Sequence, residues 1–201
     1  MKFKLTPLEK KWVLYDVANS AFTLLVSTIM PIYFNYLAGR GGLSSVDYLA
    51  YWGYATSLVT ILVAVLGPTL GTLSDLRGRK KRFFLGSVLI GSVSCVVLGF
   101  MQSWLWFLGL FVISKTAYSS SLVFYDAMLP DVTEDSRVDE VSSYGYAWGY
   151  IGSCIPFGVC LVLVLAYESI GISMEAAMVI AFFIISALCT PRPSSEKPAR
   201  A

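Results

Sequence analysis

Charged residues are scarce in this sequence. Asp, Glu, Lys and Arg make up 14% of the chain, whereas hydrophobic residues make up 56% and the mean hydropathy is +0.68. A soluble globular domain carries about 25% charged residues, so this chain could not cover its own surface in water. Side chains that face lipid need no polarity, and the composition therefore predicts an integral membrane protein.

Histidine is absent, and the four cysteines lie in apolar runs without a C-x-x-C pair. The first absence removes imidazole acid–base chemistry and the commonest metal ligand. Isolated cysteines in apolar runs are expected to be small buried hydrophobes. Lys115 and Ser119 have the spacing of a Ser–Lys dyad, but no oxyanion motif accompanies them. We therefore expect no enzyme, no cofactor and no metal site, and the net charge of +2 is too small to indicate a nucleic-acid partner.

Long apolar runs alternate with short polar connections. A spanning helix needs about 20 mostly apolar residues, so we expect an all-α domain, residues 1–190, built as a six-transmembrane-helix bundle. The last run is the shortest, and the Pro/Ser/Lys/Arg-rich segment 191–201 is expected to be a disordered polar tail. The six predicted spans lie near residues 12–38, 49–74, 83–101, 104–126, 141–167 and 174–190.

Lysine and arginine are distributed unevenly between the connections. With a cytoplasmic N-terminus, Arg40 alone lies on the outer side, and Lys115 lies within a span. Positive charge concentrates on the cytoplasmic side of membrane proteins, so both termini are predicted to be cytoplasmic. Short loops and a short N-terminus favour a bacterial plasma membrane. The remaining basic residues are Lys2, Lys4, Lys10, Lys11, Arg77, Arg79, Lys80, Lys81, Arg82, Arg137, Arg192, Lys197 and Arg200.

Polar side chains recur along the first predicted span. Asp16, Asn19, Ser20, Thr23 and Ser27 follow one another at helical spacing and share one face. Such a row predicts the lining of a water-accessible path. The alternative is a set of hydrogen bonds between helices, worth about 0.6–2 kcal/mol each. Both interpretations stay open at this point.

The fourth predicted span carries a second polar row, formed by Lys115, Ser119 and Asp126. Lys115 and Asp126 share a face but lie about 16 Å apart along the helix axis, so they cannot pair within it. Lys115 therefore needs a carboxylate on another span, a backbone carbonyl or an anionic ligand. Ionisable groups inside membrane spans usually face a bundle interior or a wet cavity, which favours a functional role.

The fifth predicted span contains a stripe of small residues, Gly145, Gly149 and Ser153, which repeat every four positions. Small residues let two helices approach closely. The stripe is therefore predicted to pack against another helix, and in a homodimer it would supply the interface.

The connection between the second and third spans contains Gly71-x-Leu73-x-Asp75, followed by Gly78-Arg79-Lys80. This pattern resembles the loop signature of the major facilitator superfamily, G-x-L-A-D-R-x-G-R-K. Leu76 stands where the family has arginine. The resemblance implies that Asp75 to Arg79 form a cytoplasmic gate latch.

Three further segments resemble the vacuole-effluxer-like branch of that superfamily, the autophagy-related amino-acid effluxers. They are Trp12 to Phe22, Val123 to Pro130 and Ser142 to Gly152. The resemblance implies the N-terminal six-helix half of a secondary transporter that works by alternating access and exports small solutes such as amino acids, with a coupled proton. A missing C-terminal half or a homodimer would complete the carrier. The alternative is a truncated membrane fragment that transports nothing.

Overall fold

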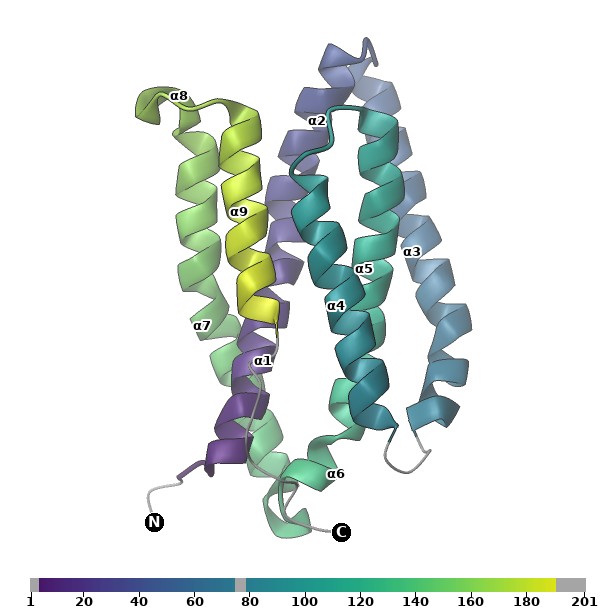
Figure 1. The fold of residues 1–201 in the computed structure, drawn as a ribbon, viewed down its shortest axis with the longest axis vertical. Coiled ribbons are helices and arrows are strands. Elements are labelled where there is room, and N and C mark those ends of the chain that lie inside the picture. Colours follow the sequence, from purple (N-terminus) through teal and green to yellow (C-terminus); the bar gives the residue numbers. More distant parts are fainter. Residues whose placement is uncertain (1–3, 75–78, 191–201) are drawn as a thin grey trace.

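The computed structural model describes residues 4–74 and 79–190, and within these ranges it contains helices and connections but no strand. The long helices run up and down and form a single bundle (Figure 1). In chain order the elements are α1 (Pro7–Leu24), the π-helical turn η1 (Leu25–Ile29), α2 (Met30–Arg40), α3 (Ser45–Ser74), α4 (Lys80–Leu98), α5 (Trp104–Ala127), α6 (Leu129–Val132), the 3-10 turn η2 (Asp135–Arg137), α7 (Val138–Leu165), α8 (Tyr167–Ile170) and α9 (Met174–Cys189).

The first membrane helix is α1, η1 and α2 in series. A capping box opens it: the Thr6 hydroxyl accepts a hydrogen bond from the Glu9 N–H, and the Glu9 carboxylate accepts one from the Thr6 N–H. Pro7 occupies the first turn, where its missing N–H costs nothing. From there the helix continues to Arg40 over 34 residues.

Within the described residues, five helices are long and apolar enough to cross a membrane, and α9 is a shorter apolar helix of 16 residues. At 1.5 Å per residue α9 rises about 24 Å, less than the roughly 30 Å of a hydrocarbon core. A helix runs through each of the six predicted segments, and the predicted all-α membrane fold is confirmed. The predicted tail, 191–201, lies outside the described residues.

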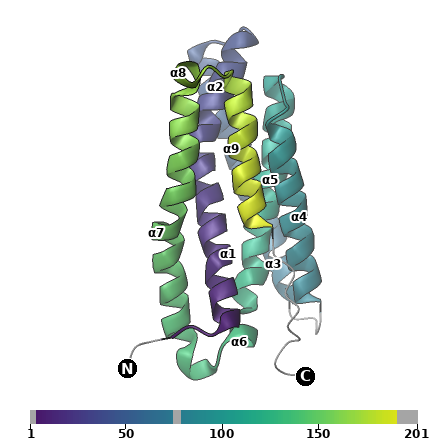
Figure 2. The same cartoon turned by 60° about the vertical axis from the view of Figure 1, so that its left-hand side comes forward.

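The helices pair in a regular way. α1 packs along α7, α5 packs along α3, and α4 packs along both α5 and α9. Figure 2 shows α7 and α1 side by side, with α9 beside them. The first three spans (α1 to α2, α3 and α4) and the last three spans (α5, α7 and α9) form two groups. The first span of each group pairs with the second span of the other group, and the two third spans pair with each other. This exchange is the arrangement expected of two three-helix repeats.

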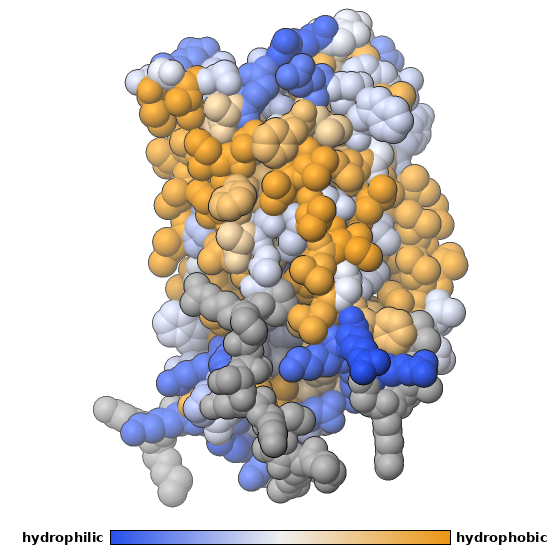
Figure 3. All heavy atoms as spheres, in the orientation of Figure 1, coloured by the Kyte–Doolittle hydropathy of each residue, from blue (hydrophilic) through white to orange (hydrophobic). Residues whose placement is uncertain are grey.

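An apolar belt surrounds the bundle between two polar ends. Figure 3 shows orange side chains across the middle and blue ones at both ends. The belt includes exposed residues of α4 and α7, among them Ile90, Val93, Ile151 and Ile155. The interior is largely aromatic, and its fully buried rings among the described residues are Phe22, Tyr33, Phe34, Phe107, Phe111, Tyr118, Phe124 and Phe182.

Candidate functional site

The polar row on α1 lies between two packed flanks of that helix. On one flank Asp16 and Ser20 touch α7 at Gly149, where an added Cβ would lie 2.7 Å from the Asp16 Oδ2 and 3.2 Å from the Ser20 Oγ. On the other flank the Phe22 ring lies 3.9 Å from the Tyr118 ring of α5. Thr23 falls between these flanks by helical position and is exposed. The row therefore opens on the side between α7 and α5.

Two hydroxyl groups of this row, those of Thr23 and Ser27, use their protons within the helix. Thr23 donates to the carbonyl of Asn19 (3.1 Å), and Ser27 donates to the carbonyl of Leu24 (3.1 Å). Both residues are exposed, and their oxygen atoms keep lone pairs that can accept hydrogen bonds. Asn19 is buried, whereas Asp16 and Ser20 are half-buried. The row thus presents mainly hydrogen-bond acceptors and one carboxylate.

The π-helical turn η1 continues α1 directly beyond Thr23. Met30 N–H bonds to the carbonyl of Leu25, five residues back. Pro31 follows and has no N–H, so one carbonyl of the preceding turn loses its intrahelical partner. Single π turns are frequent at functional sites. No feature of the sequence in this stretch predicts the π turn.

Lys115 and Ser119 are half-buried on α5, and Asp126 is exposed. The Lys115 Nζ lies 5.6 Å from the centroid of the Phe22 ring on α1, within the range of a cation–π contact. Among residues 4–74 and 79–190, no carboxylate lies within ion-pair distance of Lys115. Lys115 of the α5 row thus contacts Phe22, which flanks the polar row of α1, and no described carboxylate compensates its charge there.

A reciprocal contact near the first turns of α1 holds α1 against α5. The Trp12 and Tyr125 rings stack at 4.3 Å with an interplanar angle of 10°. The Trp12 Nε1 donates to the Tyr125 carbonyl (3.4 Å), and the Tyr125 hydroxyl donates to the Trp12 carbonyl (3.1 Å). The Tyr15 and Ser121 hydroxyls are hydrogen-bonded at 2.6 Å. Asp16 and Asp126 each follow a residue of this junction, which sequence analysis did not identify.

The loop motif is only partly described by the structure. Asp75 and Gly78 lie outside the described residues, so the predicted latch from Asp75 to Arg79 remains a prediction. Lys80 starts α4, and its Nζ donates to the Ala127 carbonyl (3.1 Å) and to the Asp131 carboxylate (3.2 Å). It therefore ties the start of α4 to the end of α5. Gly71, near the end of α3, is half-buried, and a Cβ there would meet nothing within 4 Å.

Glu9, which sequence analysis also missed, is buried where α1 begins and is 1% exposed. Besides the capping bond, its carboxylate accepts hydrogen bonds from the Thr133 hydroxyl (2.7 Å) and from Arg137 (3.1 Å). Arg137 also donates to the carbonyl of Lys4 (2.9 Å). This ion pair joins the start of α1 to the turn before α7.

The small-residue stripe on α7 is occupied within the chain. A Cβ at Gly145 would lie 2.6 Å from the Trp12 ring, and Gly149 receives Asp16 and Ser20. Ser153 is fully buried and donates to the carbonyl of Tyr150 (2.9 Å). The expectation that this stripe supplies a homodimer interface is wrong, because α1 already fills it.

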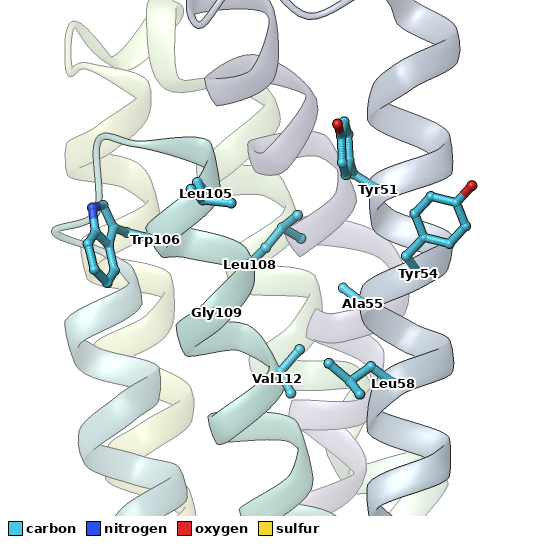
Figure 4. A pocket seen from close by; sticks show the side chains of 9 residues that line it. All are labelled: Tyr51, Tyr54, Ala55, Leu58, Leu105, Trp106, Leu108, Gly109 and Val112. Atoms are coloured by element: carbon cyan, nitrogen blue, oxygen red, sulfur yellow. The ribbon is translucent and has the colours of Figure 1, made fainter.

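A shallow apolar groove of about 410 Å³ separates the upper parts of α3 and α5. Figure 4 shows apolar side chains of both helices along it, with the Tyr51 and Tyr54 hydroxyls directed upward and outward. It belongs to the apolar belt and offers no charged group. Its lining residues are Tyr51, Tyr54, Ala55, Leu58, Leu105, Trp106, Leu108, Gly109 and Val112.

Comparison with known proteins gives two matches. Residues 41–139 match the family of proteins described as vacuole effluxer Atg22 like. The uncharacterized MFS-type transporter YxiO of Bacillus subtilis (strain 168) is 41% identical over 192 residues, which are 93% of this chain and 45% of that protein. The chain therefore spans a little under half the length of this relative. No solved structure matches the chain.

Proposed function

The chain belongs to the Atg22-like branch of the major facilitator superfamily, and from this premise we propose that it is one half of a secondary transporter for small solutes. The proposal assigns the open side between the polar rows of α1 and α5 to the solute path. Asp16, Asn19, Ser20 and Thr23 would line it from α1. Lys115, Ser119 and Asp126 would line it from α5.

The observation that carries this proposal is the mid-membrane position of Lys115. α5 runs from Trp104 to Ala127, so Lys115 lies about 17 Å from either end. That is too far for easy snorkelling to the interface. A charge at this depth is costly and characteristically faces a water-filled cavity or a transport path. The uncompensated ammonium of Lys115 therefore supports a wet path beside α5.

The mechanism we propose is alternating access, in which two six-helix halves rock about a central site. Within one half, the contacts of Trp12 with Tyr125 and of Glu9 with Arg137 would keep α1, α5 and α7 moving together. The carboxylates of Asp16 and Asp126 are the proposed carriers of a coupled proton. Amino acids are the proposed class of solute, and export is the proposed direction.

The proposed orientation places both termini in the cytoplasm of a bacterial cell. In support, α1, α4 and α7 all begin at the lower end of Figure 1, basic residues cluster near the starts of α1 and α4, and Arg137 precedes α7. Arg40 lies at the opposite end, where it pairs with Glu175 and Tyr36.

The other half of the carrier is also a matter of proposal. It would be the second half that the longer relative possesses, or a second copy of this chain bound through a surface other than the α7 stripe. The second candidate function is a membrane fragment that transports nothing. Light scattering of the purified chain, corrected for detergent mass, separates a dimer from a monomer.

Transport is tested by reconstituting the purified chain into liposomes loaded with a labelled amino-acid mixture, with a pH gradient across the membrane. We expect efflux above that of protein-free liposomes. Lys115→Ala should abolish it without reducing expression, whereas Lys81→Ala, an exposed charge at the start of α4, should not. Efflux equal to that of protein-free liposomes would favour the non-transporting fragment. Lost expression of Lys115→Ala would assign the lysine a structural role.

A further inference from the structure

The donors around Lys115 define the chemistry of a ligand. Ser119 lies one helical turn further along α5 and is half-buried, and no hydrogen-bond partner of its hydroxyl exists among the described residues. Positions four apart on a helix place their Cβ atoms about 5–6 Å from each other. The Lys115 ammonium and the Ser119 hydroxyl therefore form a pair of unused donors on one face of α5.

The carboxylates of the two rows do not neutralise this pair of donors. Asp126 lies about 16 Å from Lys115 along the axis of α5. Asp16 lies about 9 Å along α1 from Phe22, the residue over which the ammonium rests. Positive charge is thus concentrated midway through the membrane, and negative charge lies nearer the end where α1 begins.

The only described group against the ammonium is the π face of Phe22, which belongs to the buried core. A cation–π contact holds a lysine in place but leaves its three N–H donors without an acceptor. An anion that enters the open side would meet a partly desolvated charge, where electrostatic attraction is stronger than in water. The ammonium of Lys115 is therefore fixed in position with N–H donors from which an anion can accept hydrogen bonds.

We propose that Lys115 and Ser119 bind the carboxylate of the transported solute. This inference rests on the proposed transport function and names its substrate class. A carboxylate is an acceptor-only group with two oxygen atoms, which matches two adjacent donors. One lysine balances a single negative charge, so a carboxylate monoanion fits better than a phosphate dianion. A solute whose charged group is only an ammonium meets the like charge of Lys115 there.

A carboxylate of the protein itself is the competing source of the same chemistry. In a dimer, Asp16 or Asp126 of a second copy would pair with Lys115. The carboxylate of a solute would then gain no binding affinity from Lys115. The two sources differ in what Lys115 controls. A solute site makes ligand affinity depend on Lys115, whereas a protein partner makes the association of two chains depend on it.

The test measures binding to the full chain in lipid nanodiscs at pH 7 by titration calorimetry. The probes are 4-methylpentanoate, its neutral near-isostere 4-methylpentanamide, and isohexylamine. We expect the acid to bind at least about 10-fold more tightly than the amide or the amine, because a charge-assisted hydrogen bond is worth that much. Equal affinity for acid and amide, or a preference for the amine, would overturn the proposal.

Variants assign the binding to the proposed residues. Lys115→Met should weaken binding of the acid about 10- to 100-fold, and Ser119→Ala should weaken it less. Lys81→Met removes an exposed charge at the start of α4 and should leave affinity unchanged. Binding of the acid that survives both Lys115→Met and Ser119→Ala would contradict the assignment, and so would a dimer that dissociates in Lys115→Met while no acid binds. Because the wild-type chain alone discriminates acid from amide, a variant that fails to fold does not remove the test.

A transport assay distinguishes failure of the proposed transport function from failure of the proposed carboxylate site. Labelled 4-methylpentanoate and labelled isohexylamine are each loaded into liposomes that contain the chain. Movement of the amine alone would overturn the carboxylate site and leave the transporter standing. Selective binding of the acid without movement of either probe would uphold the site and count against transport by this chain alone.

Discussion

Two charged groups beside α1 have opposite surroundings. Glu9, where the helix begins, is enclosed and accepts hydrogen bonds from Thr6, Thr133 and Arg137. Lys115 lies over the ring of Phe22 in the middle of the same helix, and among the described residues its ammonium has no hydrogen bond or ion pair. Burial of a charge is tolerated when hydrogen bonds and an opposite charge compensate it. The carboxylate of Glu9 is thus bonded within the fold, whereas the donors of Lys115 stay available for the ligand that we propose.

Removing Glu9 should have the largest effect on stability. Glu9→Ala removes the carboxylate that accepts from Arg137 and from the Thr133 hydroxyl, and we expect a loss of about 2–4 kcal/mol in the free energy of unfolding. Titration with SDS in mixed micelles measures it. Glu134→Ala is the control, because Glu134 is an exposed acid in the adjacent turn. Equal losses of stability in the two variants would show that Glu9 contributes no more to the fold than an exposed acid does.

The second-largest loss of stability is expected where α1 packs against α7. Gly145→Ala introduces a Cβ at 2.6 Å from the Trp12 ring, and overpacking of this kind costs about 1–3 kcal/mol. Gly158→Ala, on the same helix, meets nothing within 4 Å and should be neutral or stabilising by up to about 1 kcal/mol. Thermal unfolding of both variants in the same detergent provides the measurement. A Gly145→Ala protein as stable as Gly158→Ala would show that α1 and α7 are not in close contact there.

Lys115→Met sharpens the contrast with Glu9. The substitution loses a cation–π contact but relieves a partly desolvated charge, so the free energy of unfolding should change by less than about 1 kcal/mol. SDS titration beside Glu9→Ala compares the two directly. A loss as large as that of Glu9→Ala would mean that Lys115 supports the fold.

The smallest effect is expected at the outer end of the bundle. Arg40 pairs with Glu175 and is largely exposed, with 58% of its side chain accessible. Exposed ion pairs contribute little and are screened by salt. Arg40→Gln should therefore lower the unfolding midpoint less than Glu9→Ala or Gly145→Ala, and the difference from the wild-type chain should shrink further in high salt. A large, salt-independent loss would contradict this view of the outer end.

Sequence periodicity located the polar rows but not their surroundings. The rows on α1 and α5 follow from 3.6-residue spacing, which is a local property. Contacts such as Trp12 with Tyr125 or Glu9 with Arg137 join positions 113 and 128 residues apart. No local pattern specifies such partners. Glu9 could have been suspected from its capping box with Thr6, although that motif does not reveal the bond to Arg137.

The α7 stripe shows the same limit. Gly145 and Gly149 predict a close helix contact, and the contact exists, but periodicity cannot say whether the partner helix comes from the same chain. In the structure the partner is α1 of the same chain. The sequence places Lys80 in the cytoplasmic loop motif, yet Lys80 also bonds to Asp131, 51 residues further along the chain, and no local pattern specifies this contact.

Water access to the open side of α1 and α5 can be measured directly with single cysteines. Thr23→Cys lies on the polar row, and Ile113→Cys lies at similar depth on the apolar belt and is 52% exposed. Both are made in a Cys154→Ser background, because Cys154 is the exposed native cysteine among the described residues. In liposomes, a membrane-impermeant thiosulfonate should modify Thr23→Cys at least about 10-fold faster than Ile113→Cys, because the reactive thiolate forms only in water. Equal rates, or faster modification of Ile113→Cys, would contradict a water-filled solute path between α1 and α5.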